Sequence, residues 1–381
     1  MKKHISILGS TGSIGVNALK IVEFLSKDIK VKYLTANKNF ELLIEQTNKY
    51  KPKSICLVDK NFYKNLKLGI NTKQVEVLVG REGLIEISKR KDVNVMLNGL
   101  VGSSGMEPTL SAIKTGVNVA LANKESLVMA GGIINKAMEL SGAKIFPVDS
   151  EHSAIWQCLV GENFNDIRRI ILTGSGGPFR SRDLDTFDDI SVKEALKHPN
   201  WDMGEKISID SATMMNKCLE VIEAYWLFQL DPEKIDIVIH PQSIVHSMVE
   251  FNDGSVKAQM GVPDMKVPIQ YALTFPSHSK SPWERLDFLS CRDLTFEGPD
   301  YDRFPALRLA YKALKKGGTA SAALNLSNDY SVQKFLENRI IFTDIYKINY
   351  SALQNHPWIG HPNLNDLRNL DSWVKNHVNE F

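Results

Sequence analysis

The first 148 residues alternate short β-branched runs with segments of helical period, and this rhythm restricts the fold more than any other feature of the chain. Alternating strands and helices form a parallel sheet covered by helices, because each helix returns the chain to start the next strand in the same direction. We therefore predict an α/β fold with a parallel sheet at its N-terminus. The strands are predicted at residues 5–8, 31–34, 54–58, 75–79, 93–97, 117–121 and 144–148.

The rhythm changes after residue 150, where the elements become fewer and longer. Strand-like residues 235–251 and 255–261 flank Asn252-Asp253-Gly254, a turn sequence that favours a hairpin with residues at positive φ, in an antiparallel or mixed sheet. Prolines, serines and scattered charges over residues 276–299 indicate a connector. Helices are predicted beyond it at residues 303–316, 320–337, 342–356 and 364–378.

Charge and cysteine content exclude several classes of function. The 46 basic and 44 acidic residues give a net charge of +2, too small a surplus to favour a nucleic acid or an anionic membrane surface as partner. The four cysteines form no CxxC pair, which argues against a thiolate metal site and fits a reducing compartment. No apolar run is long enough to span a bilayer, and the chain enters its first strand without a leader. We expect a soluble, cytoplasmic protein.

A glycine-rich turn, Gly9-Ser10-Thr11-Gly12-Ser13-Ile14-Gly15, joins the first strand to a helical run at residues 16–25. Glycines let the backbone approach a pyrophosphate, whose charge is met by amides at the helix N-terminus. The alternative is a tight turn without a ligand. The position of this turn after a strand and before a helix favours dinucleotide binding.

The end of the second strand indicates which dinucleotide is bound. Sites selective for NAD place an acidic residue there to bind the ribose 2′-hydroxyl. This chain has Asn37-Lys38-Asn39 at that point, with one cation and no acid. A 2′-phosphate is favoured beside Lys38, so we predict NADP(H), although Lys38 could also be an ordinary solvated lysine.

Acidic residues follow the strand predicted at residues 144–148, in Asp149-Ser150-Glu151-His152. Open α/β sheets bind ligands beyond the carboxyl ends of their strands. Two carboxylates there can chelate a hard divalent cation, which prefers oxygen ligands. Capping of the following helix by an acidic pair is the alternative.

A second acidic element is predicted as a helix over residues 211–220, entered from a strand at residues 207–210. On that helix Asn216 and Glu220 share a face, and Lys217 lies beside both. A carboxylate, an ammonium and an amide on one face suit a ligand with a metal-chelating end and a phosphate end. A surface ion pair between Lys217 and Glu220 is the alternative.

Two loops have compositions that suit a ligand site. Residues 173–179, Thr-Gly-Ser-Gly-Gly-Pro-Phe, offer amides and hydroxyls to an anion, or simply a flexible connection. Residues 198–204, His-Pro-Asn-Trp-Asp-Met-Gly, suit a lid that excludes water, or a loop pinned by Trp201.

His240 and His246 are predicted on one face of one strand. A zinc site is disfavoured because no third ligand is near, so we expect these two side chains to pack or to form hydrogen bonds. Lys124 and Glu125 follow the sixth strand and are candidates for contact with substrate or cofactor.

Together these motifs resemble the 1-deoxy-D-xylulose 5-phosphate reductoisomerase family of the methylerythritol phosphate route to isoprenoids. The resemblance rests on residues 9–15, 122–126, 147–152, 172–179, 198–204 and 206–217, which occur in the family's order. It implies a Rossmann-like N-terminal NADPH-binding domain (1–149), a central α/β catalytic and metal-binding domain with a dimerisation sheet (150–275), a linker (276–300) and a C-terminal helical domain (301–381). It also implies a homodimer.

The resemblance further implies a role for individual residues. Metal ligands are expected at Asp149, Glu151 and Glu220, with Mg²⁺ or Mn²⁺, and Co²⁺ as a further candidate. Catalytic residues are expected at Lys124, Glu151, His152, His198, Trp201 and Met203. Substrate contacts are expected at Lys124, Ser150, Glu151, Ser175, His198, Ser211, Asn216, Lys217 and Glu220, of which Ser175, Ser211, Asn216 and Lys217 would hold the phosphate. Cofactor contacts are expected at Thr11, Gly12, Ser13, Ile14, Asn37, Lys38, Asn39, Asn123, Glu125 and Gly204.

Two positions depart from the family pattern. Asn37 stands where a glycine is usual, and Cys218 replaces a glycine between Lys217 and Leu219. Neither change removes a group with a chemical role. The expected activity is a metal-assisted rearrangement of 1-deoxy-D-xylulose 5-phosphate followed by reduction with NADPH to 2-C-methyl-D-erythritol 4-phosphate.

Three other functions were weighed against this one. An aspartate-semialdehyde-type dehydrogenase needs an activated cysteine, which no cysteine context here suggests. A sugar-phosphate isomerase without redox chemistry leaves the glycine-rich turn unexplained. A non-catalytic NADPH sensor predicts that Glu220→Gln leaves function intact.

Overall fold

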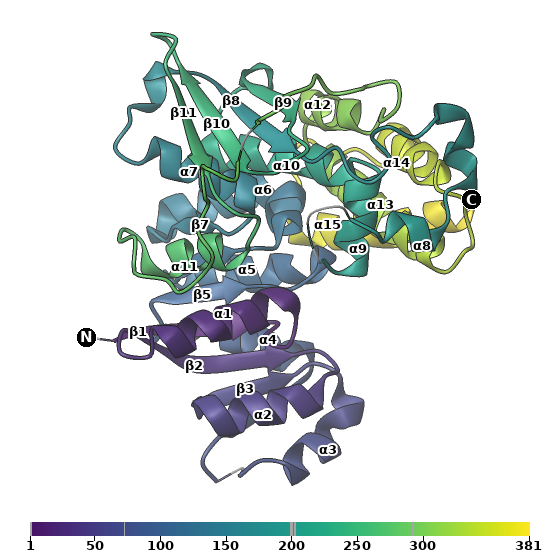
Figure 1. Ribbon diagram of the computed structural model, residues 1–381. Helices are drawn as coiled ribbons and strands as arrows, with labels where there is room; N and C mark the ends of the chain where they lie inside the picture. The colour runs from purple at the N-terminus through teal and green to yellow at the C-terminus, as the bar shows by residue number, and fades with distance from the viewer. Residues whose placement is uncertain (1, 72, 199–200, 202, 292) are drawn as a thin grey trace. The chain divides into compact units, whose positions relative to one another are not determined.

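The computed structural model describes the chain except for residues 1, 72, 199, 200, 202 and 292, and it divides into two compact units (Figure 1). Unit 1 comprises Met1–Ser126, Gly132–Ser153 and Asp264–Trp283. Unit 2 comprises Leu127–Gly131, Ala154–Pro263 and Glu284–Phe381.

Unit 1 contains a seven-stranded sheet in which every pair of neighbouring strands is parallel. The strand order is β4-β3-β2-β1-β5-β6-β7. The strands are β1 (Lys3–Leu8), β2 (Ile29–Ala36), β3 (Ser54–Leu57), β4 (Glu76–Val79), β5 (Val95–Asn98), β6 (Asn118–Leu121) and β7 (Ile145–Pro147). All seven predicted strands are confirmed, because strands buried on both faces read as short apolar runs between helices.

The order of the strands reverses at β1, which pairs with β2 on one side and β5 on the other. Ligands of open parallel sheets bind beyond the carboxyl ends of the strands at such a reversal. The turn after β1, residues 9–15, lies at this point. The helices of unit 1 are α1 (Ser13–Phe24), α2 (Phe40–Tyr50), α3 (Tyr63–Leu68), α4 (Gly80–Ser88), α5 (Met106–Lys114), α6 (Lys124–Ser141) and α11 (Lys266–Thr274).

Helix α11 comes from a late part of the chain yet contacts α1, β6 and β7 (Figure 1). Aromatic rings anchor the segment, with Phe275 5.5 Å from Phe146 and Trp283 6.2 Å from Phe24 between ring centroids. The sequence-based domain boundaries, which stay a prediction, assign this segment to the catalytic domain and the linker.

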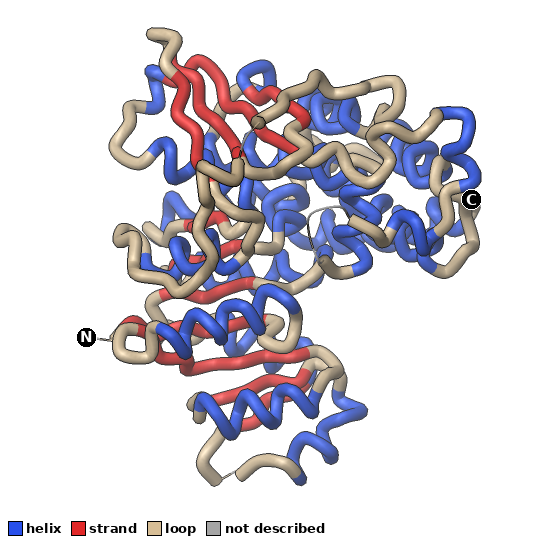
Figure 2. The backbone as a smooth tube through the Cα atoms, in the orientation of Figure 1, coloured by secondary structure: helices blue, strands red, loops and turns tan. Residues whose placement is uncertain are grey.

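Unit 2 contains a four-stranded mixed sheet in the order β11-β10-β8-β9. The strands are β8 (Ile167–Gly174), β9 (Ile235–Ile239), β10 (Val245–Phe251) and β11 (Val256–Met260), drawn red in Figure 2. Strands β8 and β9 are parallel, whereas β10 and β11 form the predicted hairpin, with Gly254 at φ +87° in its turn.

The prediction of one strand over residues 235–251 is wrong. The chain breaks between β9 and β10, where Pro241 supplies no amide and Ser243 adopts φ +53°. His240 therefore follows β9 and His246 lies in β10, so the two do not share a strand face. His240 has the hydrogen-bonding and packing role preferred above, because its Nδ1 lies 2.8 Å from the Thr295 carbonyl oxygen and its ring stacks on Phe296.

The remaining helices lie in unit 2, apart from the first four residues of α7, which belong to unit 1. They are α7 (Ser150–Leu159), α8 (Val192–Ala195), α9 (Glu205–Ala212), α10 (Met215–Phe228), α12 (Leu307–Lys316), α13 (Ala320–Leu336), α14 (Asp344–Asn355) and α15 (Leu364–Asn379). Buried apolar residues of α10, α12, α13 and α14 form one core with those of β8 and β9. The predicted fold class, a parallel α/β sheet, a mixed central sheet and C-terminal helices, is confirmed.

The prediction of a strand at residues 207–210 is wrong, because these residues lie in helix α9. Two isoleucines alternating with polar residues over four positions have the strand period, but so short a run cannot be told from a turn of helix. Consequently the predicted helix at 211–220 is also divided. Ser211 lies in the last turn of α9, Met214 adopts φ +60°, and Asn216, Lys217 and Glu220 lie on α10.

We searched the described helices for a membrane-spanning segment and found none with the necessary length and apolar character.

Candidate active site

The turn at residues 9–15, called here the N-terminal turn, requires its glycines. Gly9 adopts φ +77°, and a Cβ on Gly15 would lie 2.3 Å from the Gly9 carbonyl oxygen. Helix α1 begins at Ser13, and its N-cap Gly12 places no side chain on the first amides. Those amides are therefore available to an anion such as a pyrophosphate.

Residues 37–39 lie between β2 and α2, and all three are exposed. Asn39 caps α2, since its Oδ1 accepts a hydrogen bond of 3.1 Å from the Leu42 amide. Asn37 is not among the described residues that adopt a positive φ. An asparagine in place of the usual glycine therefore needs no left-handed conformation here.

Asn123 and Glu125 sit at the start of α6 and are buried. The Asn123 side chain caps the helix and donates hydrogen bonds of 3.0 Å and 2.8 Å to the carbonyls of Leu100 and Gly102. It also donates to Glu125 Oε2 at 3.0 Å. Asn123 thus fixes the loop after β5 and the Glu125 carboxylate together.

Asp149 follows β7, and its carboxylate pairs with two side chains. Its Oδ2 lies 2.5 Å from Lys124 Nζ, and its Oδ1 lies 3.2 Å from His152 Nδ1. Burial alone would raise the pKa of Asp149, but the positive charge of Lys124 and the hydrogen bond from His152 outweigh it and hold that pKa well below its usual value. Ser150 donates to the neighbouring Glu151 carboxylate at 2.7 Å. The segment thus presents anionic oxygens at a strand end.

Helix α10 carries the other predicted polar residues. Its N-cap, Met214, provides no capping side chain, and the amide of Met215 donates a hydrogen bond of 3.3 Å to Thr213 Oγ1 instead. Asn216 and Lys217 both donate to the carboxylate of Glu220, which is fully buried. The three side chains therefore share one face, as predicted, although the helix begins later than predicted.

Residues 174–177, called here the glycine loop, pack directly on this helix pair. A Cβ on Gly174 would lie 2.9 Å from Lys217 Cε. Gly177 adopts φ +70°, and a Cβ on it would lie 2.7 Å from the Ser211 carbonyl oxygen. Ser175 Oγ accepts a hydrogen bond of 3.2 Å from the Gly177 amide. The structure thus brings Ser175, Ser211 and Lys217 together around a loop rich in backbone amides, which suits a phosphate.

Residues 198–204, called here the Trp201 loop, contact the glycine loop through His198. The Trp201 amide donates to His198 Nδ1 at 3.0 Å, so the ring proton lies on Nε2, which donates to Ser175 Oγ at 3.1 Å. Burial lowers the pKa of His198 to about 4, which keeps the ring neutral. The Trp201 ring centroid lies 6.4 Å from that of His246. Pro199, Asn200 and Asp202 of this loop lie outside the described residues.

The ends of the Trp201 loop adjoin regular structure. Met203 is half-buried, and Gly204 is the N-cap of α9, with its carbonyl accepting a hydrogen bond of 3.0 Å from Ser208 Oγ.

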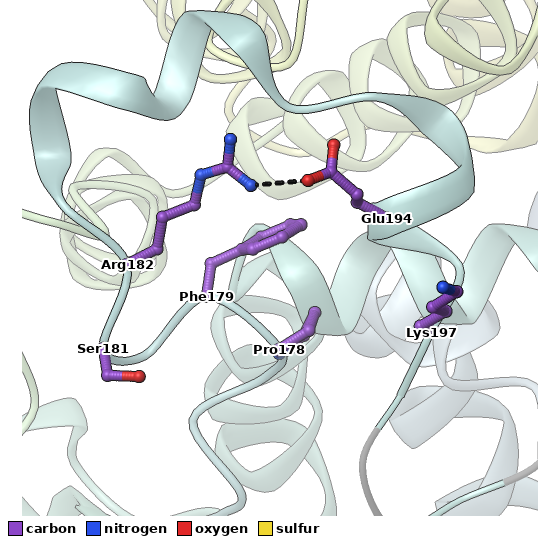
Figure 3. Close-up of a pocket in the computed structure, with 6 residues that line it drawn as sticks. All are labelled: Pro178, Phe179, Ser181, Arg182, Glu194 and Lys197. Atoms are coloured by element: carbon purple, nitrogen blue, oxygen red, sulfur yellow. Dashed lines mark hydrogen bonds and ion pairs between the residues drawn. The ribbon is translucent and has the colours of Figure 1, made fainter.

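A pocket of about 370 Å³ was not predicted from the sequence. It lies between residues 178–182, which follow the glycine loop, and residues 194–197, which precede the Trp201 loop. Arg182 and Glu194 face each other across it, joined at 2.8 Å, and the Arg182 guanidinium lies 5.6 Å from the Phe179 ring centroid (Figure 3). The pattern Ser191-Val192-Lys193-Glu194 is a capping box and could have located helix α8. The pocket is lined by Pro178, Phe179, Ser181, Arg182, Glu194 and Lys197.

Three family models match the chain. Residues 5–131 match 1-deoxy-D-xylulose 5-phosphate reductoisomerase, residues 145–228 match the C-terminal domain of the same enzyme, and residues 260–377 match a DXP reductoisomerase C-terminal domain. Together they extend over nearly the whole chain.

Full-length relatives agree. A 1-deoxy-D-xylulose 5-phosphate reductoisomerase of Chloroherpeton thalassium is 49% identical over 99% of this chain and 97% of the relative. The solved enzyme of Zymomonas mobilis in complex with NADPH is 41% identical with a TM-score of 0.93, over 99% of this chain and 98% of that one. A DOX-P reductoisomerase in complex with NADPH, fosmidomycin and magnesium is 38% identical with a TM-score of 0.95 at the same coverage. This chain therefore belongs to the 1-deoxy-D-xylulose 5-phosphate reductoisomerase family of enzymes.

Proposed function

We propose that this chain rearranges 1-deoxy-D-xylulose 5-phosphate and reduces the product to 2-C-methyl-D-erythritol 4-phosphate, using NADPH and a divalent metal. The observation that carries the proposal is the packing of the glycine loop on Lys217 and Ser211. That packing places a cation, a hydroxyl and backbone amides around one small volume, which suits a phosphate monoester. The match to full-length members of the family supplies the rest of the substrate.

NADPH is assigned to the N-terminal turn. The open amides of α1 suit its pyrophosphate, and the exposed Lys38 suits its 2′-phosphate. The Zymomonas mobilis relative in complex with NADPH supports this choice. Cofactor contacts are proposed at Thr11, Gly12, Ser13, Ile14, Asn37, Lys38, Asn39, Asn123, Glu125 and Gly204.

A divalent cation is assigned to Asp149, Glu151 and Glu220. Their carboxylate oxygens are hard ligands of the kind that a divalent cation prefers, and the family resemblance points to the same three residues. The magnesium in a related enzyme supports Mg²⁺, with Mn²⁺ and Co²⁺ as further candidates. The cation, when bound, supplies Lewis acid character to the substrate's ketone and an adjacent hydroxyl.

The remaining residues bind and orient the substrate. Ser175, Ser211, Asn216 and Lys217 would hold its phosphate and so supply binding energy away from the reacting carbons. Lys124, Ser150 and His152 would contact its hydroxyls. His198, Trp201 and Met203 would close over it and exclude water, with neutral His198 donating to Ser175.

The pKa values of the buried cysteines argue against the dehydrogenase alternative, which needs a thiolate. Burial raises the pKa of Cys56 to about 12 and that of Cys158 to about 11. The pKa of Cys218 is raised further by its complete burial. These thiols stay protonated at neutral pH, which makes them poor nucleophiles.

The direct test mixes purified protein with NADPH, 1-deoxy-D-xylulose 5-phosphate and Mg²⁺ or Mn²⁺, and follows NADPH absorbance with the product identified by mass. We expect one NADPH consumed per substrate, loss of activity on chelation, and recovery when metal is returned. Product formation without NADPH loss would point instead to an isomerase. Absence of any reaction with metal present would reject the proposal.

A homodimer is proposed from the family resemblance and from exposed apolar side chains. Phe288 and Leu289 of the predicted linker are 68% and 91% exposed, and the edge strand β11 exposes Val256. Sedimentation equilibrium should give twice the chain mass, and Leu289→Lys should shift it toward the monomer. A monomeric native chain would reject this proposal.

A cytoplasmic location also stays a proposal. The four free cysteines support it, and cell fractionation would test it.

A further inference from the structure

Asp210 is a buried carboxylate that the proposed chemistry does not use. It lies one residue before Ser211 on helix α9, and only 2% of it is exposed. Its oxygens accept two hydrogen bonds, one of 2.8 Å from Lys206 Nζ on the same helix and one of 2.7 Å from Asn328 Nδ2 on α13. A buried charge is costly unless it is paired, so both partners matter to this carboxylate.

The contacts of Asp210 continue into the C-terminal helices. Asn328 Oδ1 accepts a hydrogen bond of 3.0 Å from Asn349 Nδ2 on α14. Asn349 Oδ1 in turn accepts from Ser327 Oγ at 2.9 Å, and Lys206 also pairs with Asp329 at 3.1 Å. We call Lys206, Asp210, Asn328 and Asn349 the Asp210 network. Buried polar networks whose members are hydrogen-bonded hold elements in one arrangement, unlike apolar packing, which tolerates sliding.

The element that this network holds is the turn between α9 and α10. Ser211 follows Asp210 directly, and its carbonyl oxygen is the atom against which Gly177 packs. The same carbonyl accepts a hydrogen bond of 3.2 Å from the Met214 amide, at the left-handed residue where α10 begins. A displacement of Asp210 would therefore move Ser211, the glycine loop contact and the N-terminus of α10 together.

We infer that Asp210 and Asn328 are positioning residues through which the C-terminal helices set the geometry of the phosphate-binding turn at Ser211. The inference rests on the proposed function, because it takes Ser211, Asn216 and Lys217 as the groups that hold the substrate phosphate. Neither Asp210 nor Asn328 touches the phosphate. They act by fixing the backbone of a residue that does.

The central test is Asn328→Ala in the full-length protein with NADPH and Mg²⁺ present. We expect the dissociation constant of inorganic phosphate, measured by calorimetry, and the KM for 1-deoxy-D-xylulose 5-phosphate each to rise about tenfold, the usual scale for losing a hydrogen bond to a charge. The kcat should stay within about twofold, since the reacting carbons lie away from the phosphate. The dissociation constant of NADPH should not change.

The matched control is Asn325→Ala. Asn325 lies three residues earlier on α13 and is equally buried, so its loss also perturbs the helix. We expect it to lower Tm while leaving the phosphate dissociation constant unchanged. If Asn328→Ala and Asn325→Ala lower Tm alike and neither changes phosphate binding or KM, the positioning role is overturned.

Asp210 itself is tested with two variants. Asp210→Asn keeps an oxygen that can accept from Asn328 but loses the charge opposite Lys206, so it should raise KM less than Asp210→Ala does. Because Asp210→Ala leaves Lys206 without this partner and can fail to fold, the isosteric Asn variant carries the test. In a double-mutant cycle, Asp210→Asn with Asn328→Ala should raise the phosphate dissociation constant by less than the product of the single effects. Full multiplicativity would overturn the link between the two residues.

Lys217→Met separates failure of this inference from failure of the proposed function. If Lys217→Met weakens phosphate binding and Asn328→Ala does not, the Asp210 network has no positioning role and the proposed function stands. If Lys217→Met leaves phosphate binding unchanged, the assigned phosphate site is wrong and the inference fails with it.

Discussion

The N-terminal turn and the glycine loop are both glycine-rich segments that follow a strand, yet they are built differently. In the N-terminal turn, Gly15 meets the carbonyl of Gly9, six residues away, and the chain enters α1 at once. In the glycine loop, Gly174 and Gly177 meet Lys217 and Ser211, which come from other helices later in the chain. The N-terminal turn is built within one strand-turn-helix unit, whereas the glycine loop packs on segments distant in the chain.

This difference explains why the two segments were unequally predictable. A local motif carries its context in neighbouring residues, so a turn between a strand and a helix favoured dinucleotide binding from sequence alone. An assembled site has no such signature, and the glycine loop could equally have been a flexible connection. The difference also predicts that damage to the N-terminal turn stays local, whereas damage near the glycine loop spreads to several ligand groups.

The largest effect is expected at Glu220, the carboxylate that anchors Asn216 and Lys217 on the assembled side. Glu220→Gln keeps the shape but removes the charge, so we expect kcat to fall at least about a thousandfold and Mn²⁺ binding, followed by electron paramagnetic resonance, to weaken. The exposed Glu233→Gln is the control and should behave like the native chain. Activity within tenfold of native would reject the metal-binding role of Glu220.

The next effect compares the two glycine segments directly. Gly177→Ala combines φ +70° with a contact 2.7 Å from the Ser211 carbonyl, so phosphate should bind about thirtyfold more weakly while NADPH binding is unchanged. Gly15→Ala should weaken NADPH binding and leave phosphate binding unchanged. Gly142→Ala, also at positive φ but with nothing within 4 Å of the added Cβ, controls for backbone strain alone. If either glycine variant weakened both ligands, the distinction between local and assembled sites would be lost.

A smaller effect is expected at Lys38, beside the N-terminal turn. Lys38→Ala should raise the KM for NADPH about tenfold and leave the KM for NADH unchanged, because only the 2′-phosphate loses a charged partner. Lys30→Ala is the control, because Lys30 is also exposed but lies on the preceding strand β2. An equal change for both cofactors would mean that Lys38 does not read the 2′-phosphate.

The smallest effect concerns pH and the Trp201 loop. The pKa of His198 is lowered from 6.5 to about 4 by burial, so a state that exposes this ring would bind more protons than the described arrangement between these values. The buried arrangement of His198 should therefore lose stability as the pH falls from 6.5 toward 4. We expect the KM for substrate to rise about threefold between pH 7 and pH 5.5.

The control for this pH effect is His198→Gln, which keeps a donor toward Ser175 but does not titrate in this range. The KM of this variant for substrate should change less between pH 7 and pH 5.5 than the native KM does. Because burial also lowers the pKa of His246, beside Trp201, to about 4, a small residual slope in the same direction is expected. Identical native and variant profiles would exclude a role for His198 protonation.

The sequence was informative where structure repeats locally. The seven strands of unit 1 were placed within two residues at each end, because apolar runs between helices leave few alternatives. The four helices after residue 300 were also located, although the first begins at Leu307 and not at residue 303. The polar face of Asn216, Lys217 and Glu220 was also foreseen, since spacing on a helix fixes which residues are neighbours.

Long-range relations could not be read in the same way. The hydrogen bond between Asn328 and Asp210 joins residues 118 positions apart, and no local pattern announces it. The strand predicted at residues 207–210 was a helix, because tertiary packing overrides the weak preferences of four residues. Pairing of Arg182 with Glu194 likewise became visible only in three dimensions.

Helix α11 has a consequence for the order in which the protein is made. Unit 1 buries Phe146 against Phe275 and covers β6 and β7 with a segment that follows residues 154–263 in the chain. A nascent chain that has emerged only to residue 153 would still display apolar surface that α11 later covers. Unit 1 can therefore reach its final state only after most of unit 2 has left the ribosome, so a fragment for isolated study should splice residues 264–283 onto residues 1–153.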